Sequence, residues 1–326
     1  MAEKIRWGIL GPGKIARKFA EGLKSVPEAE LAAVGSRSQE RAEAFAEDFN
    51  IPRRHGSYAA LAADEQVDAI YVATPHAMHK DSAICCLQAG KAVLCEKPFA
   101  INAAQAREVI QFARKKKLFL MEAMWTRFLP YIVKLRELLA DGAIGQVRMV
   151  CGDFGFRAGF DPKSRLFDPN LGGGGLLDVG VYPVSLASMI LGEPSEVAAL
   201  AELGRTGVDE QAAFVLKCPT GQLAVLFTGV RTLTPMEATI MGTDGYIRLH
   251  SPWWRGMTLS VHAGGKEQVH ELPHEGNGYN YEAAEVGRCL REGKLESQVM
   301  PLDETLSVMR TLDRIRAQWG LKYPME

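Results

Sequence analysis

The chain has 326 residues, of which 47% are hydrophobic and 24% are charged, and its formal net charge is −1. This balance excludes a general electrostatic attraction to nucleic acid or to an anionic membrane, and the length favours two domains over one. No apolar run approaches the roughly 18–20 residues of a membrane span, and the opening stretch MAEKIRWGIL has no signal-peptide pattern, so we expect a cytoplasmic protein. The six cysteines form no C-x-x-C pair and no Cys/His cluster, which predicts reduced thiols and no metal site.

The first 124 residues alternate short apolar runs with longer amphipathic segments. The predicted strands are 5–10, 30–36, 67–74, 91–96 and 118–123, and the predicted helices are 14–26, 38–49, 79–90 and 102–116. Each strand is apolar enough to be buried on both faces, as in a parallel sheet. The alternation predicts a Rossmann-type, doubly wound α/β domain over residues 1–124.

The turn after the first predicted strand carries the pattern G-x-G-x-x-A, at Gly11, Gly13 and Ala16. Gly11 permits a tight turn, Gly13 lets a pyrophosphate approach the backbone, and Ala16 lets the helix lie close to the sheet. Lys14 and Ile15 begin that helix, where backbone N–H groups are available to phosphates. In this strand–turn–helix context the pattern predicts a dinucleotide site, whereas a tight turn without a ligand is the alternative.

A second phosphate-binding pattern overlaps the first. The residues from Gly8 to Lys14 also fit G-x-x-x-x-G-K, the start of the loop found in nucleoside triphosphatases. That loop needs a hydroxyl after the lysine to bind Mg²⁺, and here the residue is Ile15. This difference argues against a triphosphatase.

The end of the second predicted strand indicates which dinucleotide fits. An NAD site usually has an acidic residue there, but the sequence has Ser36, Arg37 and Ser38, with Arg41 one helical turn further on. A guanidinium and hydroxyl groups suit a 2′-phosphate. We therefore expect NADP to be preferred over NAD, unless Arg37 is simply an exposed residue at the start of a helix.

Polar residues follow two other predicted strands, at Thr74-Pro75-His76 and Glu96-Lys97-Pro98. Ligands of doubly wound sheets bind beyond the carboxyl ends of the strands, so both segments are expected near the nicotinamide. Pro98 restricts the backbone of the residue before it, which limits the freedom of Lys97. We assign Thr74, His76, His79, Glu96 and Lys97 to cofactor contacts, although a histidine in such a loop can equally be structural.

The sequence pattern changes after about residue 124. A helix is predicted over 130–142, followed by a strand within 145–156, the glycine-rich loop LGGGG at 171–175 and a helix over 176–192. Short alternating runs follow at 196–203, 211–218, 222–229, 237–243, 246–250, 257–263 and 267–272, and two helices at 279–292 and 302–318 close the chain. We expect residues 125–326 to form an α+β domain with a large, open, mostly antiparallel sheet, for substrate binding and dimerisation.

Three segments give the chain a family resemblance. The E-K-P element at 96–98, MEAMWTRFLP at 121–130 and LLDVGVYP at 176–183 resemble the Gfo/Idh/MocA oxidoreductases, over essentially the whole chain. Within that family, the last two segments resemble the branch that contains dimeric dihydrodiol dehydrogenases and NADP-dependent D-xylose 1-dehydrogenases. The resemblance implies an NADP-dependent dehydrogenase that acts on a trans-dihydrodiol or an aldose.

The same resemblance implies that Lys97 is an active-site lysine and that Tyr182 is the acid/base. The chemistry agrees, because hydride removal from a carbinol carbon requires a base for the hydroxyl proton, and a nearby ammonium favours the phenolate form of a tyrosine. Asp178 lies four residues before Tyr182, and we expect it to orient Lys97 or the substrate hydroxyls. The alternatives are a surface aspartate and a structural, buried tyrosine.

Further residues are expected to bind the substrate, by resemblance to the branch. They are Trp125, Arg127, Phe154, Trp254 and Tyr279, together with Asp178 and Tyr182. Aromatic rings suit the C–H face of a sugar and the ring of a dihydrodiol equally well. The branch also implies a homodimer formed through the C-terminal sheet, in which Arg148 and Arg205 are possible interface residues.

Three other functions fit the same features. Two are enzymes of the same family: a sugar or anhydrosugar reductase, and a glycosidase that uses NAD in transient oxidation. The third is an NADPH sensor without catalysis, because a fold does not fix a function. The presence of both Lys97 and Tyr182 argues against the sensor, since sensing needs no proton transfer.

Overall fold

The computed structural model describes residues 4–326, which divide into two compact units. Among these residues, the first unit comprises 4–100, 104–125 and 275–305, and the second comprises 101–103, 126–274 and 306–326. The single boundary expected at 124/125 therefore differs from the observed division, because a C-terminal segment packs with the N-terminal residues.

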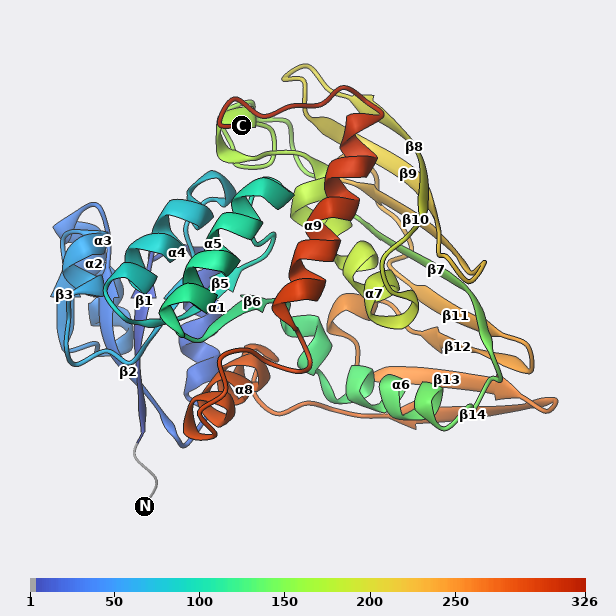
Figure 1. Cartoon of the computed structure of the whole chain (residues 1–326), viewed down its shortest axis with the longest axis horizontal. Coiled ribbons are helices and arrows are strands. Elements are labelled where there is room, and N and C mark those ends of the chain that lie inside the picture. Colours follow the sequence, from blue (N-terminus) through green and yellow to red (C-terminus); the bar gives the residue numbers. More distant parts are fainter. Residues whose placement is uncertain (1–3) are drawn as a thin grey trace. The chain divides into compact units, whose positions relative to one another are not determined.

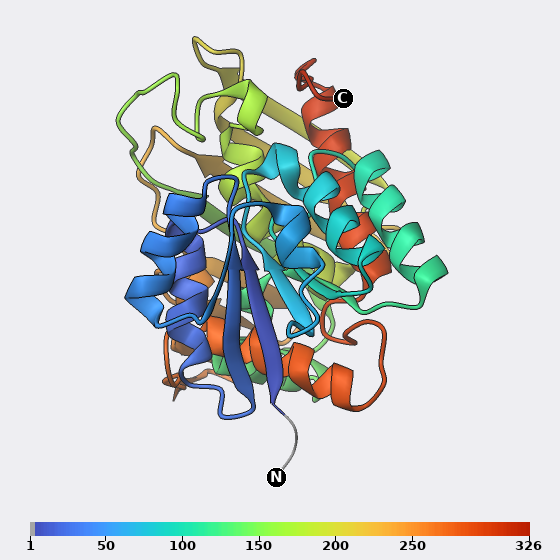
Figure 2. The ribbon, with the colours of Figure 1, turned by 90° about the vertical axis from the view of Figure 1, so that its left-hand side faces the viewer.

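The first unit contains a six-stranded parallel sheet in the order β3-β2-β1-β4-β5-β6. Its strands are β1 (Ile5–Leu10), β2 (Ala29–Gly35), β3 (Arg53–His55), β4 (Ala69–Val72), β5 (Ala92–Glu96) and β6 (Leu120–Ala123). Its helices are α1 (Lys14–Leu23), α2 (Gln39–Phe49), α3 (Tyr58–Ala62), α4 (His79–Gln88), α5 (Ala103–Lys116) and α8 (Tyr279–Arg291). Helices lie on both faces of the sheet (Figure 2). The predicted Rossmann domain is confirmed.

Burial explains why these strands lack polar alternation. All residues of β4, β5 and β6 are buried, since helices cover both faces. Between β1 and α1, the ring of Phe19 packs edge-on against Trp7 at 5.2 Å and stacks on Tyr71 at 3.8 Å. These contacts fix α1 on the sheet, and with it the glycine turn.

Helix α8 belongs to the first unit through contacts that the sequence analysis did not predict. It packs against α1 at Gly22, where an added Cβ would lie 2.7 Å from Oδ1 of Asn277, and Asn277 donates a hydrogen bond to the carbonyl of Lys18 at 2.7 Å. The chain then returns along β6, where the N–H of Leu120 donates to the carbonyl of Leu295 at 3.1 Å. The segment after α8 thus covers the edge strand of the sheet.

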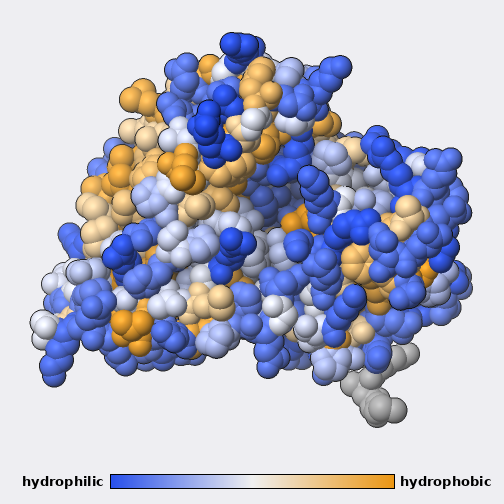
Figure 3. All heavy atoms as spheres, turned by 180° about the vertical axis from the view of Figure 1, so that it is seen from behind, coloured by the Kyte–Doolittle hydropathy of each residue, from blue (hydrophilic) through white to orange (hydrophobic). Residues whose placement is uncertain are grey.

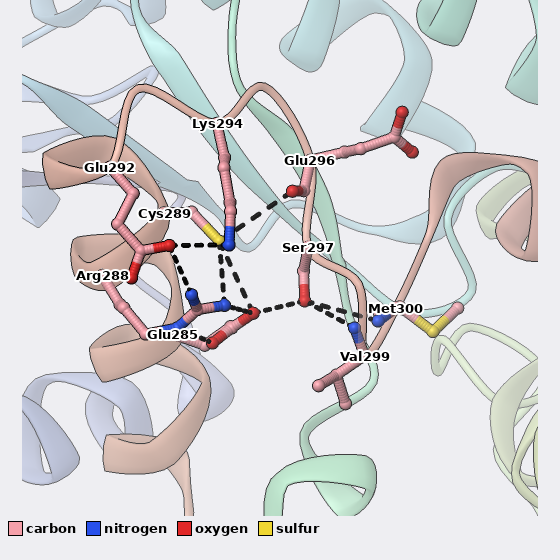
Figure 4. Close-up of polar contacts among 9 residues, drawn as sticks. All are labelled: Glu285, Arg288, Cys289, Glu292, Lys294, Glu296, Ser297, Val299 and Met300. Atoms are coloured by element: carbon pink, nitrogen blue, oxygen red, sulfur yellow. Dashed lines mark hydrogen bonds and ion pairs between the residues drawn. The ribbon is translucent and has the colours of Figure 1, made fainter.

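A polar cluster fastens this returning segment to α8 (Figure 4). The hydroxyl of Ser297, which is fully buried, donates to Glu285 at 2.5 Å and accepts the N–H groups of Val299 and Met300 at 3.0 and 3.4 Å. Arg288 pairs with Glu285 at 2.8 Å from the next turn of the helix. Ser297 therefore links the loop after α8 to Glu285 of the helix.

The second unit contains an eight-stranded sheet in the order β14-β13-β12-β11-β7-β10-β9-β8 (Figure 1). Its strands are β7 (Val147–Gly155), β8 (Glu196–Leu203), β9 (Asp209–Lys217), β10 (Leu223–Gly229), β11 (Ala238–Gly242), β12 (Gly245–Leu249), β13 (Thr258–Ala263) and β14 (Lys266–Glu271). Only the β7–β10 pair is parallel among these described strands. The expected open, mostly antiparallel sheet is confirmed.

Helices cover one face of this sheet. They are α6 (Pro130–Ala140), α7 (Val181–Leu191) and α9 (Leu302–Ala317), whose first residues fall in the first unit. Helix α7 packs on β7 and β10, and a π-helical turn, Leu176–Gly180, leads directly into it. The stretch Pro169–Leu191 is, among the described residues, the one helix long and apolar enough for a membrane span, contrary to the sequence expectation. However, 78% of its most apolar window is buried inside the protein, as in a core helix.

The opposite face of the sheet carries exposed apolar side chains. Residues of β9 alternate between buried and exposed positions, and β8 and β10 place Leu200 and Val225 on the same exposed face as Val215. Leu200 is 81% exposed and Leu233, in the loop after β10, is 72% exposed. We call the set Leu200, Ala213, Val215, Val225, Phe227 and Leu233 the sheet patch; apolar surface gathers on this side of the unit (Figure 3).

Candidate active site

A groove of about 470 Å³ lies at the carboxyl ends of β1, β2 and β4 in the first unit. It brings together Gly11, Pro12, Gly13, Ser36, Arg37, Ser38, Arg41, Tyr58, Ala73, Thr74 and Pro75. Most of the residues expected to bind the phosphates and the adenosine end of a cofactor are in this set. Lys14 and Ile15 begin α1 beside it, without lining it.

The two glycines of the turn have different roles. Gly11 has φ +91° and an added Cβ would lie 3.1 Å from the carbonyl of Ala73, so the tight turn requires glycine. At Gly13, an added Cβ would meet no atom within 4 Å. The bare backbone at Gly13 therefore leaves open space in front of α1, where the helix N-terminus attracts an anion.

The charge of the groove is positive. Arg37 and Arg41 both line it, none of its lining residues is acidic, and within residues 4–326 neither guanidinium has an ion-pair partner. The serines are used locally, since Ser38 caps α2 by accepting the N–H of Arg41 at 3.4 Å and Ser36 accepts the N–H of Ser38 at 3.3 Å. The groove thus holds two arginines that are available to an anionic group.

Glu96 and Lys97 follow β5, and the carboxylate of Glu96 organises this loop. It accepts the hydroxyl of Tyr71 and, at 3.1 Å, the backbone N–H of Lys97. Burial raises the pKa of Tyr71 well above its usual value, and the charge of Glu96 adds to this, so Tyr71 stays a phenol and a donor. The Lys97–Pro98 peptide bond is cis.

A second carboxyl group, Glu282 of α8, lies behind Glu96. It is fully buried, and both of its oxygens lack a hydrogen-bond partner within the described part of the chain. Burial raises the pKa of Glu282 well above its usual value, and the neighbouring charge of Glu96 raises it further. Burial thus favours the neutral form of Glu282, while Glu96 is the carboxyl group that contacts the backbone N–H of Lys97.

His79, for which a cofactor contact and a structural role were both considered, bonds to the backbone of two loops. Its ring is fully buried, with Nδ1 2.8 Å from the carbonyl of Pro98 and Nε2 2.8 Å from that of Thr74. Burial lowers the pKa of His79, and the two carbonyls oppose that effect. The ring connects the loop after β4 to the loop after β5. His76, also buried, packs edge-on at 5.7 Å from it.

The expected substrate residues fall into two sets, one in each unit. Trp125 and Tyr279 belong to the first unit, where their rings stack at 4.5 Å. Phe154, Tyr182 and Trp254 form a cluster in the second unit. Phe154 stacks on Trp254 at 4.8 Å, and the ring of Tyr182 lies 5.3 Å from Phe154 and 6.3 Å from Trp254. Tyr182 is 6% exposed, and its ring is surrounded on these sides by aromatic neighbours.

Asp178 pairs with an arginine that the sequence analysis did not single out. Its carboxylate is buried and contacts the guanidinium of Arg165 at 2.6 and 3.4 Å. Arg165 lies in the loop between β7 and the π-helical turn, and its side chain is 57% exposed. Tyr182, in an aromatic cluster, and Asp178, in an ion pair with Arg165, thus lie one helical turn apart.

Arg127 is buried and supports the helix of Tyr182. Its guanidinium donates to the hydroxyl of Ser185 at 3.0 Å and to the carbonyl of Ser185 at 2.8 Å. Ser185 lies in α7, three residues after Tyr182. These contacts fit a positioning role for Arg127, and its expected contact with the substrate stays a prediction.

Sequence reasoning missed Tyr58, Tyr71, Arg165 and Glu282. Tyr58 and Arg165 lie in or beside loops without a periodic pattern, and Tyr71 reads as a core residue of a buried strand. Glu282 is distant in sequence from its neighbours. Within residues 4–326 no group of three or more His, Cys, Asp or Glu side chains is placed to hold a metal, and all six cysteines are unpaired.

Similarity to known proteins covers both units. Residues 5–124 match the family described as "Oxidoreductase family, NAD-binding Rossmann fold", and residues 132–248 match the "GFO/IDH/MocA C-terminal domain". Trans-1,2-dihydrobenzene-1,2-diol dehydrogenase from Mus musculus is 39% identical, over 99% of each chain.

Two solved structures are also similar. An aldose-aldose oxidoreductase from Caulobacter crescentus, complexed with glycerol, has a TM-score of 0.90 and 27% identity, over 98% of this chain and 99% of that one. A 3-ketoreductase from Actinomadura kijaniata, in complex with NADP and TDP-benzene, has a TM-score of 0.87 and 26% identity, over 97% and 98% of the two chains.

Proposed function

Because this chain belongs to the Gfo/Idh/MocA family and is an NAD(P)-dependent oxidoreductase, we propose that it transfers a hydride between NADP and a hydroxyl-bearing carbon of a trans-dihydrodiol or of an aldose such as D-xylose. One observation carries this proposal: Tyr182 lies in an aromatic cluster one helical turn from the buried Asp178. A protein that only senses a cofactor needs the groove, but not this arrangement of acid/base groups.

The groove of the first unit supports NADP as the coenzyme. Its glycine turn leaves space for the pyrophosphate, and Arg37 and Arg41, which form no ion pair with other described residues, offer two guanidinium groups to a 2′-phosphate. No carboxylate lines the groove to bind a free 2′-hydroxyl. When bound, the coenzyme would supply the hydride acceptor or donor through its nicotinamide.

In this proposal Tyr182 moves the proton. During oxidation the phenolate takes the hydroxyl proton while the carbinol carbon loses its hydride, so a neutral carbonyl forms. During reduction the phenol returns the proton. Lys97 favours the phenolate electrostatically. Asp178, held by Arg165, accepts hydrogen bonds from substrate hydroxyls and limits how the substrate is oriented.

The substrate class follows from the surroundings of Tyr182. Stacked Phe154 and Trp254 present flat apolar faces, and Asp178 and Arg165 supply polar groups nearby. Such a mixture suits a ring that carries vicinal hydroxyls, either a dihydrodiol or a pyranose. The similarity to a dihydrodiol dehydrogenase favours the first and the similarity to an aldose-aldose oxidoreductase supports the second.

A ketoreductase that works mainly in the reducing direction is the second candidate. Similarity to a 3-ketoreductase supports it, and the same Tyr182 would then act as the proton donor. An anhydrosugar reductase or a glycosidase with transient oxidation would use the same residues. Steady-state rates in both directions distinguish these candidates.

The central test is a substrate panel with a matched pair of variants. Dihydrodiols, aldoses and polyols are assayed with NADP⁺ and NAD⁺ by nicotinamide absorbance. We expect turnover with NADP⁺, and a fall in kcat of about 10²–10⁴ for Tyr182→Phe with NADP⁺ affinity unchanged. Tyr246→Phe is the control, because Tyr246 lies on β12, where it stacks on His262 at 4.3 Å and is 40% exposed. If the Tyr182→Phe variant keeps near-normal activity, Tyr182 is not the group that transfers the proton.

We also propose that a second copy of the chain covers the sheet patch. The register aligns Leu200, Ala213 and Phe227 in one row across β8, β9 and β10, so the exposed apolar surface is continuous over three strands. A monomer rarely leaves such a surface open to water, and two sheets of this kind pack face to face.

Leu200→Glu tests that proposal. A charge at this 81% exposed position would have to be buried in a dimer, so we expect mass measurement by light scattering to show monomers. Leu295→Glu, at a 45% exposed leucine of the first unit, should leave the mass at the dimer value. A monomeric wild-type protein, or a Leu200→Glu variant with unchanged mass, would contradict the proposal.

A further inference from the structure

The glycine loop that precedes the helix of Tyr182 encloses a buried carboxyl group. Asp209, the first residue of β9, is fully buried. Gly174, with φ +114°, lies against its Oδ1, where any Cβ would collide, and a Cβ at Gly175 would lie 3.3 Å from its Oδ2. Close approach to this carboxyl group therefore explains the last two glycines of LGGGG, Gly174 and Gly175.

The carboxyl group of Asp209 holds the first residues of the helix. Its Oδ2 accepts the N–H of Leu176 at 2.6 Å, and the N–H of Gly175 also points to the carboxyl. Its Oδ1 is buried and has no hydrogen-bond partner among residues 4–326. Tyr323 fastens the other side of the loop by donating to the carbonyl of Gly173 at 2.7 Å.

Asp209 contacts the first residues of the helical segment that carries the proposed catalytic groups. Asp178 is the third residue of the π-helical turn and Tyr182 is the second residue of α7. Arg127 donates hydrogen bonds to the same helix at Ser185, three residues after Tyr182. We propose that Asp209 is a positioning residue, which sets the place of Asp178 and Tyr182 through its contact with the N–H of Leu176, and that the stability of this closed loop depends on the protonation of the buried carboxyl group.

The charges around Asp209 explain the preference for the neutral form. From the C-terminal segment it faces Tyr323, behind which Arg316 and Glu326 pair with each other. On β9 its neighbour Glu210 faces Arg231 at 3.6 Å, and on the helix Asp178 is paired with Arg165. None of these described cations forms an ion pair with Asp209. Burial raises the pKa of Asp209 to about 7, although the N–H groups of Leu176, Asp209 and Gly175 lower it in part.

The difference in the pKa of Asp209 between the closed and the open loop gives the direction in which pH changes loop opening. If the loop opens, Asp209 reaches water and regains a pKa of about 4. The closed loop binds this proton more tightly than the open loop, so opening becomes easier as pH rises from about 4 to about 7, by up to about tenfold per pH unit. Above about 7 the effect levels off, because both forms are then ionised.

Hydrogen exchange of the full chain tests this inference. We compare peptides covering residues 172–182 at pH 5 and pH 8, after correction for the intrinsic exchange rates. Wild-type protection should fall by at least about tenfold between these pH values. Asp209→Asn keeps the shape and an acceptor oxygen but cannot ionise, so its protection should be independent of pH.

Two further variants serve as controls. Asp168→Asn changes an aspartate of the same loop that caps a turn by accepting the N–H of Asn170 at 2.8 Å and that is not fully buried, so it should keep the wild-type pH dependence. Gly174→Ala forces a side chain against Asp209 and should lower protection at both pH values. Wild-type protection that does not change with pH, or an equal change in Asp209→Asn, would overturn the inference.

The effect on catalysis rests on the proposed function. We expect Asp209→Ala to lower kcat with NADP⁺ affinity unchanged, and Asp209→Asn to restore most of it, with a pH profile that differs from wild type between 5 and 8. If no substrate turns over, the proposed function fails but the exchange result still decides the role of Asp209. If turnover is normal and Asp209→Ala behaves as wild type, only the positioning role is removed.

Discussion

The two units build their parts of the proposed site in opposite ways. In the first unit the groove is made around a local turn, in which Gly11 and Gly13 are two residues apart and present backbone without side chains. In the second unit the cluster around Tyr182 is made by side chains from β7, the helix and the loop before β13. The groove of the first unit requires glycines, which have no side chain, whereas the cluster of the second unit requires large aromatic side chains.

This difference predicts how each unit tolerates substitution. A groove built on a glycine turn and two arginines loses coenzyme affinity mainly when charge is removed, whereas a side-chain cluster loses catalysis when one group is changed. Three experiments test the comparison, beginning with the largest expected effect.

Lys97 and Tyr182, one from each unit, are predicted to act in the same proton transfer. Each single variant, Lys97→Met or Tyr182→Phe, should lower kcat by about 10²–10⁴ at saturating coenzyme. The double variant should lose little more than the worse single variant, because groups that act as a unit are not additive. Losses that multiply would show that the two residues serve separate steps.

Arg37→Ala should weaken NADP⁺ binding by about 10- to 100-fold, since a charge-assisted contact to the 2′-phosphate contributes about 1.5–3 kcal/mol. NAD⁺ binding should be unchanged, because NAD⁺ lacks that phosphate. Titration of both coenzymes by fluorescence measures the effect. Arg17→Ala is the control, as Arg17 lies in α1 and pairs with Asp48 at 2.6 Å outside the groove. Equal losses for both coenzymes would refute the selectivity.

Ser297→Ala should give the smallest effect, on stability alone. It leaves Glu285 and two backbone N–H groups without their shared partner, at a cost of about 1–3 kcal/mol. In urea unfolding of the full chain, followed by two probes, the loss should appear in the transition of the first unit. Ser164→Ala changes a partly buried serine of the second unit, which donates to the carbonyl of Asp161 in a loop, and should change stability by less than about 0.5 kcal/mol.

Local patterns made the first unit predictable. The buried runs, the glycine turn and the Ser36–Arg41 segment all lie within a few residues of the features they determine. Two residues assigned to ligand contacts, Arg127 to the substrate and His79 to the cofactor, are harder to interpret, since both also bond to the protein's own backbone or side chains. An arginine or a histidine has the same sequence signal in either role.

By itself, the sequence determined the fold class, the cofactor turn and the positive charge of the groove, because strand periodicity and glycine turns are short-range properties of the chain. Only the tertiary structure decided that α8 packs with the N-terminal unit, that Glu282 lies behind Glu96 and that Asp209 fills the glycine loop. Each of these pairs is separated by more than 30 residues, and burial in a shared, poorly hydrated space, which no local pattern records, is what gives those carboxyl groups their properties.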